Sequence, residues 1–179
     1  MNAIKLPFKF DVELIKKELS QFSKEDYRDI YNASVTLKTL WLIHLIEPIN
    51  DADGLPVFLP NAALKKCPYL LSVFETFNCP VETFRIHVLD PGASIQPHRD
   101  NGYRFKDGMV RLHIPIKTSK NVELIIDKER VFMQPGECWY CDFHKVHEVH
   151  NYSEEPRIHL ILDCKVNEWL TGIFNKVID

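Results

Sequence analysis

The stretch from Val81 to Cys164 holds eight short runs of β-forming residues, and no other feature of the chain limits its fold as strongly. Turn residues such as Pro91-Gly92 and Pro135-Gly136 separate these runs. The runs cover residues 83–89, 94–98, 109–117, 122–127, 130–133, 137–143, 147–152 and 157–164. So many short strands in one region are typical of an antiparallel double sheet. We therefore predict a mainly β fold with flanking helices around a double-stranded β-helix, the jelly-roll core that cupins share.

The rest of the chain predicts helices and one strand that pack on this core. Asp11 can cap a helix over residues 12–19, and residues 35–46 are rich in β-formers. Residues 51–54 read as a loop, residues 62–77 as a helix with Pro68 near its first turns, and residues 166–177 as a closing helix. We expect a single domain over 1–179, with a helical and mixed portion at 1–80, the jelly-roll core at 81–164 and a C-terminal helix at 165–179.

Composition excludes several classes of partner. The formal net charge is −3 and the Lys and Arg residues form no stripe, which argues against nucleic acid. No segment has the roughly 20 apolar residues of a membrane span, and the first ten residues lack the apolar run of an export signal. At least one of the five cysteines cannot pair within the chain. We therefore expect reduced thiols and a cytoplasmic protein, and the oligomeric state stays open.

Histidines are concentrated in the β-rich region, and this favours a metal site. Seven of the eight lie between His87 and His159. His98 and Asp100 are two residues apart, so on an extended chain both side chains point to the same side. Two imidazoles and one carboxylate can hold iron on one face and leave other coordination positions open. Spacing alone allows equally well that His98 and Asp100 are a solvent-facing strand end.

The third ligand is ambiguous from spacing. His144, His147 and His150 are all candidates, and strand alternation places His150 on the opposite side from His147. Asp142 and Glu148 could orient the ligand imidazoles.

Two groups of basic residues could serve a ligand or simply be structural. Arg157 begins an otherwise apolar run, where a buried guanidinium needs a carboxylate partner from a ligand or from an internal acid. Arg111 and His113 form another pair two residues apart, and for an isolated pair of this kind internal acids are the more common partners.

Cys138 and Cys141 resemble a thiol-exchange or zinc motif, but residues three apart on a strand face opposite ways. We interpret them as two unrelated structural cysteines.

Taken together, three blocks of sequence resemble the aspartyl/asparaginyl β-hydroxylase family of iron(II)- and 2-oxoglutarate-dependent oxygenases, which includes bacterial proline hydroxylases. The blocks cover residues 85–100, 110–116 and 136–163. The resemblance implies His98, Asp100 and His147 as metal ligands, with Asp142 and His147 matching the family's Asp-x-x-x-x-His arrangement. It also implies Arg157 as the residue that binds the distal carboxylate of 2-oxoglutarate, with Arg111 and His113 contacting the same keto acid.

By the same resemblance, the protein would use Fe(II), 2-oxoglutarate and O2 to hydroxylate an amino acid or an aminoacyl residue of proline, Asp or Asn type, releasing succinate and CO2. A peptide or protein Asp/Asn β-hydroxylase is one alternative. Another is a cupin-like metal-binding sensor or binding module without oxygenase activity. Five residues are candidates for contacting the substrate: Trp41, His44, Tyr103, Arg104 and His150.

Overall fold

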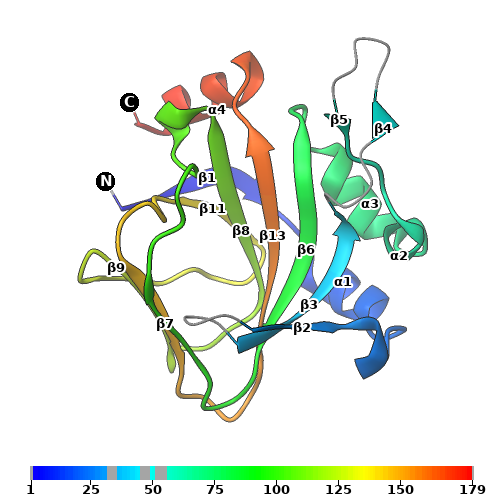
Figure 1. Cartoon of the computed structure of the whole chain (residues 1–179), viewed down its shortest axis with the longest axis vertical. Helices are drawn as coiled ribbons and strands as arrows, with labels where there is room; N and C mark the ends of the chain where they lie inside the picture. Colours follow the sequence, from blue (N-terminus) through cyan, green and yellow to red (C-terminus); the bar gives the residue numbers. More distant parts are fainter. Residues whose placement is uncertain (1, 32–35, 45–48, 51–55, 179) are drawn as a thin grey trace.

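A computed structural model of the protein describes residues 2–31, 36–44, 49–50 and 56–178, and its strands form two facing sheets (Figure 1). The major sheet has seven antiparallel strands, in the order β1 (Ala3–Lys9), β11 (Glu137–Cys141), β8 (Met109–Lys117), β13 (Arg157–Lys165), β6 (Val81–Leu89), β3 (Thr36–Ile43) and β2 (Arg28–Tyr31). The minor sheet has four, in the order β10 (Glu129–Val131), β9 (Val122–Ile126), β12 (His147–Asn151) and β7 (Ser94–His98). The short strands β4 (Ile49–Asn50) and β5 (Pro56–Val57) pair separately.

Helices cover the outer face of the major sheet (Figure 1). They are α1 (Val12–Leu19), α2 (Ala62–Lys65), α3 (Pro68–Glu75) and α4 (Glu168–Ile178), with short 3-10 turns at Lys24–Asp26 and Phe105–Asp107. Strand alternation turns Phe84, Ile86, Leu112, Leu160 and Leu162 toward these helices, where they form the larger apolar core. A smaller apolar cluster lies between the two sheets and includes residues of both.

The fold class predicted from the sequence is confirmed, and each of the eight predicted strands ends within two residues of its observed bounds. Asp11 caps α1 as expected, because its side chain accepts hydrogen bonds from the backbone N–H groups of Glu13 and Leu14. The predicted loop at 51–54 lies outside the described residues. Cys138 belongs to the larger core and Cys141 to the smaller cluster, so the two thiols do lie on opposite faces of β11.

Two features of the N-terminal portion differ from the prediction. The single helix expected at 62–77 is two helices, because Pro68 disfavours helical geometry at Cys67, which instead adopts φ −121° and ψ 79°. The strand β1 was not predicted, since Lys5, Pro7 and Lys9 hide its pattern. As an edge strand it tolerates a proline and exposed lysines. Together with β2 and β3, β1 extends the major sheet. The N-terminal portion therefore supplies strands of that sheet in addition to helices that pack on it.

The turn before β11 gives a test of this arrangement. Gly136 has φ +80°, and a Cβ added there would collide with the backbone oxygen of Phe10. The Phe10 N–H also donates a hydrogen bond to the Gly136 carbonyl at 2.9 Å. Gly92 has a similar φ of +72° but open space around it. Gly92→Ala should therefore cost only the left-handed strain of about 1–2 kcal/mol. Gly136→Ala should add an overpacking cost of about 1–3 kcal/mol. Urea unfolding of both variants measures the difference. Equal losses in the free energy of unfolding would contradict the close contact between Phe10, directly after β1, and this turn.

Candidate metal centre and keto-acid pocket

The pairing of β12 with β7 brings His98 and His147 together. The two residues are direct partners in the antiparallel register, and their ring centroids lie 4.2 Å apart. Asp100 follows β7, and its N–H donates to the Phe143 carbonyl at 2.9 Å, which holds this segment against the loop before β12. One ligand atom from each of His98, Asp100 and His147 lies within 4.8 Å of the other two.

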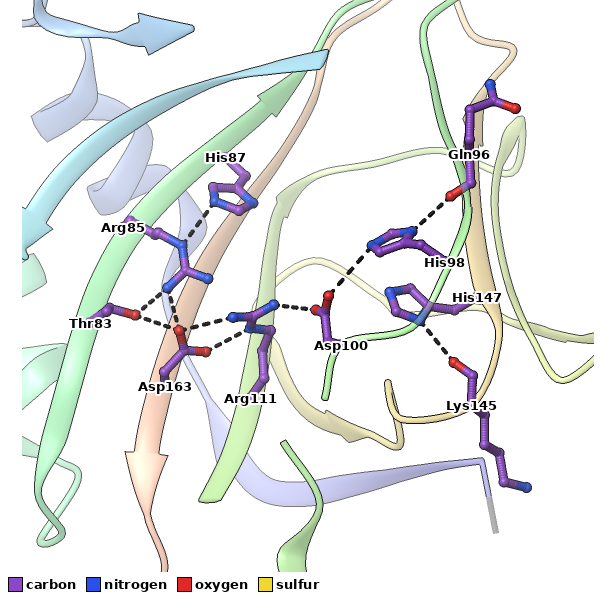
Figure 2. A network of polar contacts seen from close by, with 10 residues as sticks. All are labelled: Thr83, Arg85, His87, Gln96, His98, Asp100, Arg111, Lys145, His147 and Asp163. Atoms are coloured by element: carbon purple, nitrogen blue, oxygen red, sulfur yellow. Dashed lines mark hydrogen bonds and ion pairs between the residues drawn. The ribbon is translucent and has the colours of Figure 1, made fainter. Parts of the chain in front are cut away.

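Backbone carbonyls determine which ring nitrogens face this site (Figure 2). His98 Nδ1 lies 2.7 Å from the Gln96 carbonyl, and His147 Nδ1 lies 3.0 Å from the Lys145 carbonyl. Because a carbonyl only accepts, each Nδ1 carries the proton and each Nε2 keeps a lone pair for a metal. Burial is the main cause that lowers the pKa of His147 and favours this neutral form. The suggestion that Asp142 and Glu148 orient these imidazoles was wrong, because backbone oxygens do so.

Asp100 presents one oxygen to the site and the other to an arginine. Its Oδ1 lies 3.6 Å from His98 Nε2, and its Oδ2 accepts a hydrogen bond from Arg111 Nη1. Arg111 is itself held by Asp163, through Nε to Oδ1 at 2.7 Å and Nη2 to Oδ2 at 3.1 Å. The ring of Tyr103 lies over the Arg111 guanidinium at 4.1 Å.

Asp163 joins two arginines on the inner face of the major sheet, as Figure 2 shows. Besides Arg111, it accepts from Arg85 Nη1 and from Thr83 Oγ1, both at 2.8 Å. Burial alone would raise the pKa of the Asp163 carboxyl, but the two guanidinium groups outweigh burial and lower it. Arg85 Nε also donates to His87 Nε2 at 2.9 Å, so His87 is a neutral acceptor.

Arg157 is the third arginine of this face, and its surroundings differ. Its exposed fraction is 3%, and burial lowers its pKa to about 10. Among the residues that the structure describes, no carboxylate pairs with it. Its Nη2 lies 3.1 Å from His159 Nδ1. The Nδ1 atoms of His113 and His159 lie 3.4 Å apart. His113 Nε2 is buried with no hydrogen-bond partner among the described residues.

A cavity of about 200 Å³ lies between the candidate metal ligands and Arg157. Its polar lining contains the three candidate ligands together with His87, Arg111, His113 and Arg157. Its apolar lining comes from both sheets and contains Ile30, Leu37, Ile95, Leu124, Phe143, Val149 and Ile161. The cavity therefore places a cationic group without a carboxylate partner and an unsatisfied imidazole nitrogen beside the candidate ligands.

The five residues predicted to contact substrate lie in different surroundings. None of them is among the described residues that line the cavity. Tyr103 covers Arg111, while Trp41 stacks on Arg85 at 5.4 Å and contacts His44 at a ring distance of 4.0 Å. Arg104 pairs with Asp107 at 2.7 Å, away from the metal ligands.

His150 faces away from the cavity. On β12 it alternates with the buried His147 and Val149, and it contacts Ser94 Oγ at 3.0 Å and Glu148 Oε2 at 2.8 Å. The structure thus places His147, and not His150, at the candidate metal centre.

Sequence reasoning did not identify Thr83, Arg85, His87, His159 or Asp163 as parts of the site. The signal that could have found them is alternation. Thr83, Arg85 and His87 alternate with apolar residues in β6, and Arg157, His159 and Asp163 lie on one face of β13 with Ile161. The two strands are neighbours, with Asp163 opposite Thr83. Polar residues in such a pattern are normally assigned to the solvent side, whereas here they face the other sheet.

The donor set fits a transition metal that accepts nitrogen and oxygen ligands. Two neutral imidazoles and one carboxylate oxygen on one side of a cavity match the facial arrangement of non-haem iron(II).

Removing the central carboxylate tests the charge balance of this face. Asp163 has an exposed fraction of 2%, so Asp163→Asn would leave the buried Arg85 and the partly buried Arg111 poorly compensated. We expect a loss of about 3–5 kcal/mol in the free energy of unfolding at pH 7. Because folding lowers the pKa of this carboxyl, its stabilisation is present above the unfolded-state value of about 4 and is lost as pH falls below it.

Urea titrations across pH measure this loss. The gap between the parent and Asp163→Asn should narrow as pH falls below about 4. Lys117→Gln, which removes an exposed ion pair with Glu155, is the control and should cost less than about 1 kcal/mol. A gap that stays constant in acid would contradict the compensating role of Asp163.

Comparisons with known proteins agree with this geometry. The profile of the aspartyl/asparaginyl beta-hydroxylase family matches residues 10–166. An L-proline cis-4-hydroxylase from Rhizobium meliloti (strain 1021) is 31% identical over 115 residues, which cover 63% of this chain and 41% of that protein. The chain thus matches about two fifths of that relative's length.

Two solved structures share the fold at low sequence identity. An oxidoreductase of the 2OG-Fe(II) oxygenase family from Burkholderia pseudomallei has a TM-score of 0.60 and 12% identity, covering 93% of this chain and 86% of the other. The viral collagen prolyl hydroxylase of Paramecium bursaria Chlorella virus-1, solved as its 2OG complex, has a TM-score of 0.55 and 11% identity, covering 93% and 97%. In the described part of this chain, no helix has the length and apolar character to cross a bilayer.

Proposed function

The chain belongs to the aspartyl/asparaginyl beta-hydroxylase family, and we propose that it is an iron(II)- and 2-oxoglutarate-dependent dioxygenase acting on an amino acid or an aminoacyl residue. One observation carries the proposal: a single cavity holds the two-histidine, one-carboxylate group together with a buried arginine that has no carboxylate partner among the described residues. A domain that only binds a metal would have no use for the uncompensated charge of Arg157.

His98, Asp100 and His147 would hold the iron through His98 Nε2, Asp100 Oδ1 and His147 Nε2. When bound, iron(II) and 2-oxoglutarate would supply the oxidation by O2 that converts a C–H bond into C–OH, with succinate and CO2 as co-products. The chain's own residues position these groups. Arg111 donates a hydrogen bond to Asp100 Oδ2, so Asp100 would bind the metal through Oδ1.

Arg157 would bind the distal carboxylate of 2-oxoglutarate, because a buried guanidinium gains most from a bidentate anion. Beside it, His113 Nε2 is buried without a hydrogen-bond partner among the described residues, and this imidazole would face the keto acid in its neutral form, since burial holds the pKa of His113 well below its usual range. The apolar residues Leu124, Phe143 and Val149 would exclude water from the carbon chain of the keto acid.

For the substrate, we propose an amino acid or aminoacyl residue of proline, Asp or Asn type. The family profile and the proline hydroxylase relative support this class. Trp41 and Tyr103 are our candidates for substrate contact, since their rings cover the guanidinium groups of Arg85 and Arg111 in the network next to the metal ligands. A cytoplasmic location remains part of this proposal.

The keto-acid role is tested by anaerobic titration of the iron(II)-loaded protein with 2-oxoglutarate, following the visible charge-transfer band of the chelate. The parent should develop the band. Arg157→Ala should weaken 2-oxoglutarate binding by about 100-fold or more and keep its iron. Arg130→Ala, which removes an arginine that pairs with Glu123 on the minor sheet, should bind like the parent. An iron-loaded parent that shows no 2-oxoglutarate binding would favour the metal-binding module instead.

The ligand assignment is tested with two histidines of the same strand. His147→Ala should lose iron(II), because two protein ligands hold a divalent ion poorly, while His150→Ala should retain it. Metal content after anaerobic loading and gel filtration measures both. Iron retained by His147→Ala and lost by His150→Ala would reverse the assignment.

A further inference from the structure

The contact between Arg157 and His159 fixes the protonation of that histidine. A guanidinium group has only donors, so the Nη2 to Nδ1 contact of 3.1 Å requires a lone pair on His159 Nδ1. His159 is therefore neutral and carries its proton on Nε2. Burial is the main cause that lowers the pKa of His159 well below its usual range, and the Arg157 charge lowers it further.

The position of His159 on β13 lets it accept a hydrogen bond from the Arg157 guanidinium on the side away from the main cavity. Arg157 and His159 are two apart on β13 and therefore share the inner face of the major sheet. The neighbours of His159 in register are His87 on β6 and Pro115 on β8, and neither carries a negative charge. Arg157 lines the main cavity and also a second cavity of about 10 Å³, whereas His159 lines only the second.

The three arginines of this face give the decisive comparison. Arg85 and Arg111 both donate to the carboxylate of Asp163, so their charges are compensated inside the protein. Arg157 donates instead to a neutral imidazole. A neutral acceptor restricts the rotation of the guanidinium but leaves its full charge available to a ligand, whereas a carboxylate would also neutralise it.

We propose that His159 is a positioning residue that orients Arg157 toward the distal carboxylate of the keto acid while leaving its charge uncompensated. This inference rests on the proposed function. It means that binding of the keto acid depends both on the hydrogen bond from Arg157 to residue 159 and on the absence of a charge at that residue.

Three substitutions separate the hydrogen bond from the charge. His159→Asn keeps a neutral acceptor close to the position of Nδ1. His159→Leu has the same number and branching of side-chain heavy atoms as Asn but no acceptor. His159→Asp offers the strongest acceptor but adds a negative charge. All three are compared with the parent as iron(II)-loaded proteins, with thermal unfolding and iron affinity measured in parallel.

The readout is the dissociation constant for 2-oxoglutarate and, separately, for 2-oxobutanoate, which lacks the distal carboxylate. His159→Asn should bind 2-oxoglutarate within about threefold of the parent. His159→Leu should bind it about 10-fold more weakly, and His159→Asp about 100-fold more weakly. Binding of 2-oxobutanoate and iron(II) should change little in all three, which a general loss of structure would not produce.

Two results would overturn the inference. One is equal 2-oxoglutarate affinity for the Asn and Leu variants, whose side chains have the same branched arrangement of heavy atoms, so this comparison holds even if the Asp variant does not fold. The other is parent-like affinity in a folded Asp variant. If the iron-loaded parent itself fails to bind 2-oxoglutarate, the proposed function fails, and that result is distinct from a failure confined to the variants.

Discussion

The carboxylate of Asp163, held between Arg85 and Arg111, is the interaction on which the site depends. The inner face of the major sheet carries three arginines and several histidines, and burying so much charge is costly unless it is paired. Asp163 compensates two of the guanidinium groups, and through Arg111 it also fixes the free oxygen of Asp100. The charge balance of the sheet and the geometry of the metal ligands are thus set by one network, which crosses three neighbouring strands (Figure 2).

The division of the major sheet into two unlike faces explains how such a polar interior is tolerated. The outer face buries Phe84, Ile86, Leu112 and Leu160 against the helices, so the apolar core lies behind the site and not within it. That core holds β6, β8 and β13 rigidly, and rigid strands keep the inner polar side chains in the geometry that ligand binding needs. The imidazoles of this face stay neutral because burial lowers the pKa values of His87, His113 and His159, so they serve as acceptors beside the arginines and not as further cations.

Sequence reasoning predicted what local signals encode. Turn residues indicated the boundaries of the eight strands of 81–164, and Asp11 indicated where α1 begins. The three candidate ligands are found together. Spacing did not separate His147 from His144 and His150, and His147 was chosen by the family resemblance. In the structure the pairing of His147 with His98 makes the choice, and a register between distant strands has no local signature. The edge strand β1 was missed for a related reason, since its partner β11 lies more than a hundred residues away in the chain.

The polar residues of β6 and β13 were not predicted for a different physical reason. Alternation tells which residues share a face but not which face meets water, and polar residues are assigned to solvent by default. Here helices cover the apolar face and the minor sheet covers the polar one, so the usual assignment is reversed. Arg157 and Arg111 show the consequence, because the sequence predicts that either could pair with an internal acid or with a ligand. Only the neighbouring strands decide that one of them meets Asp163 and the other a neutral histidine, and this difference leaves a single guanidinium with its full charge for an anionic ligand.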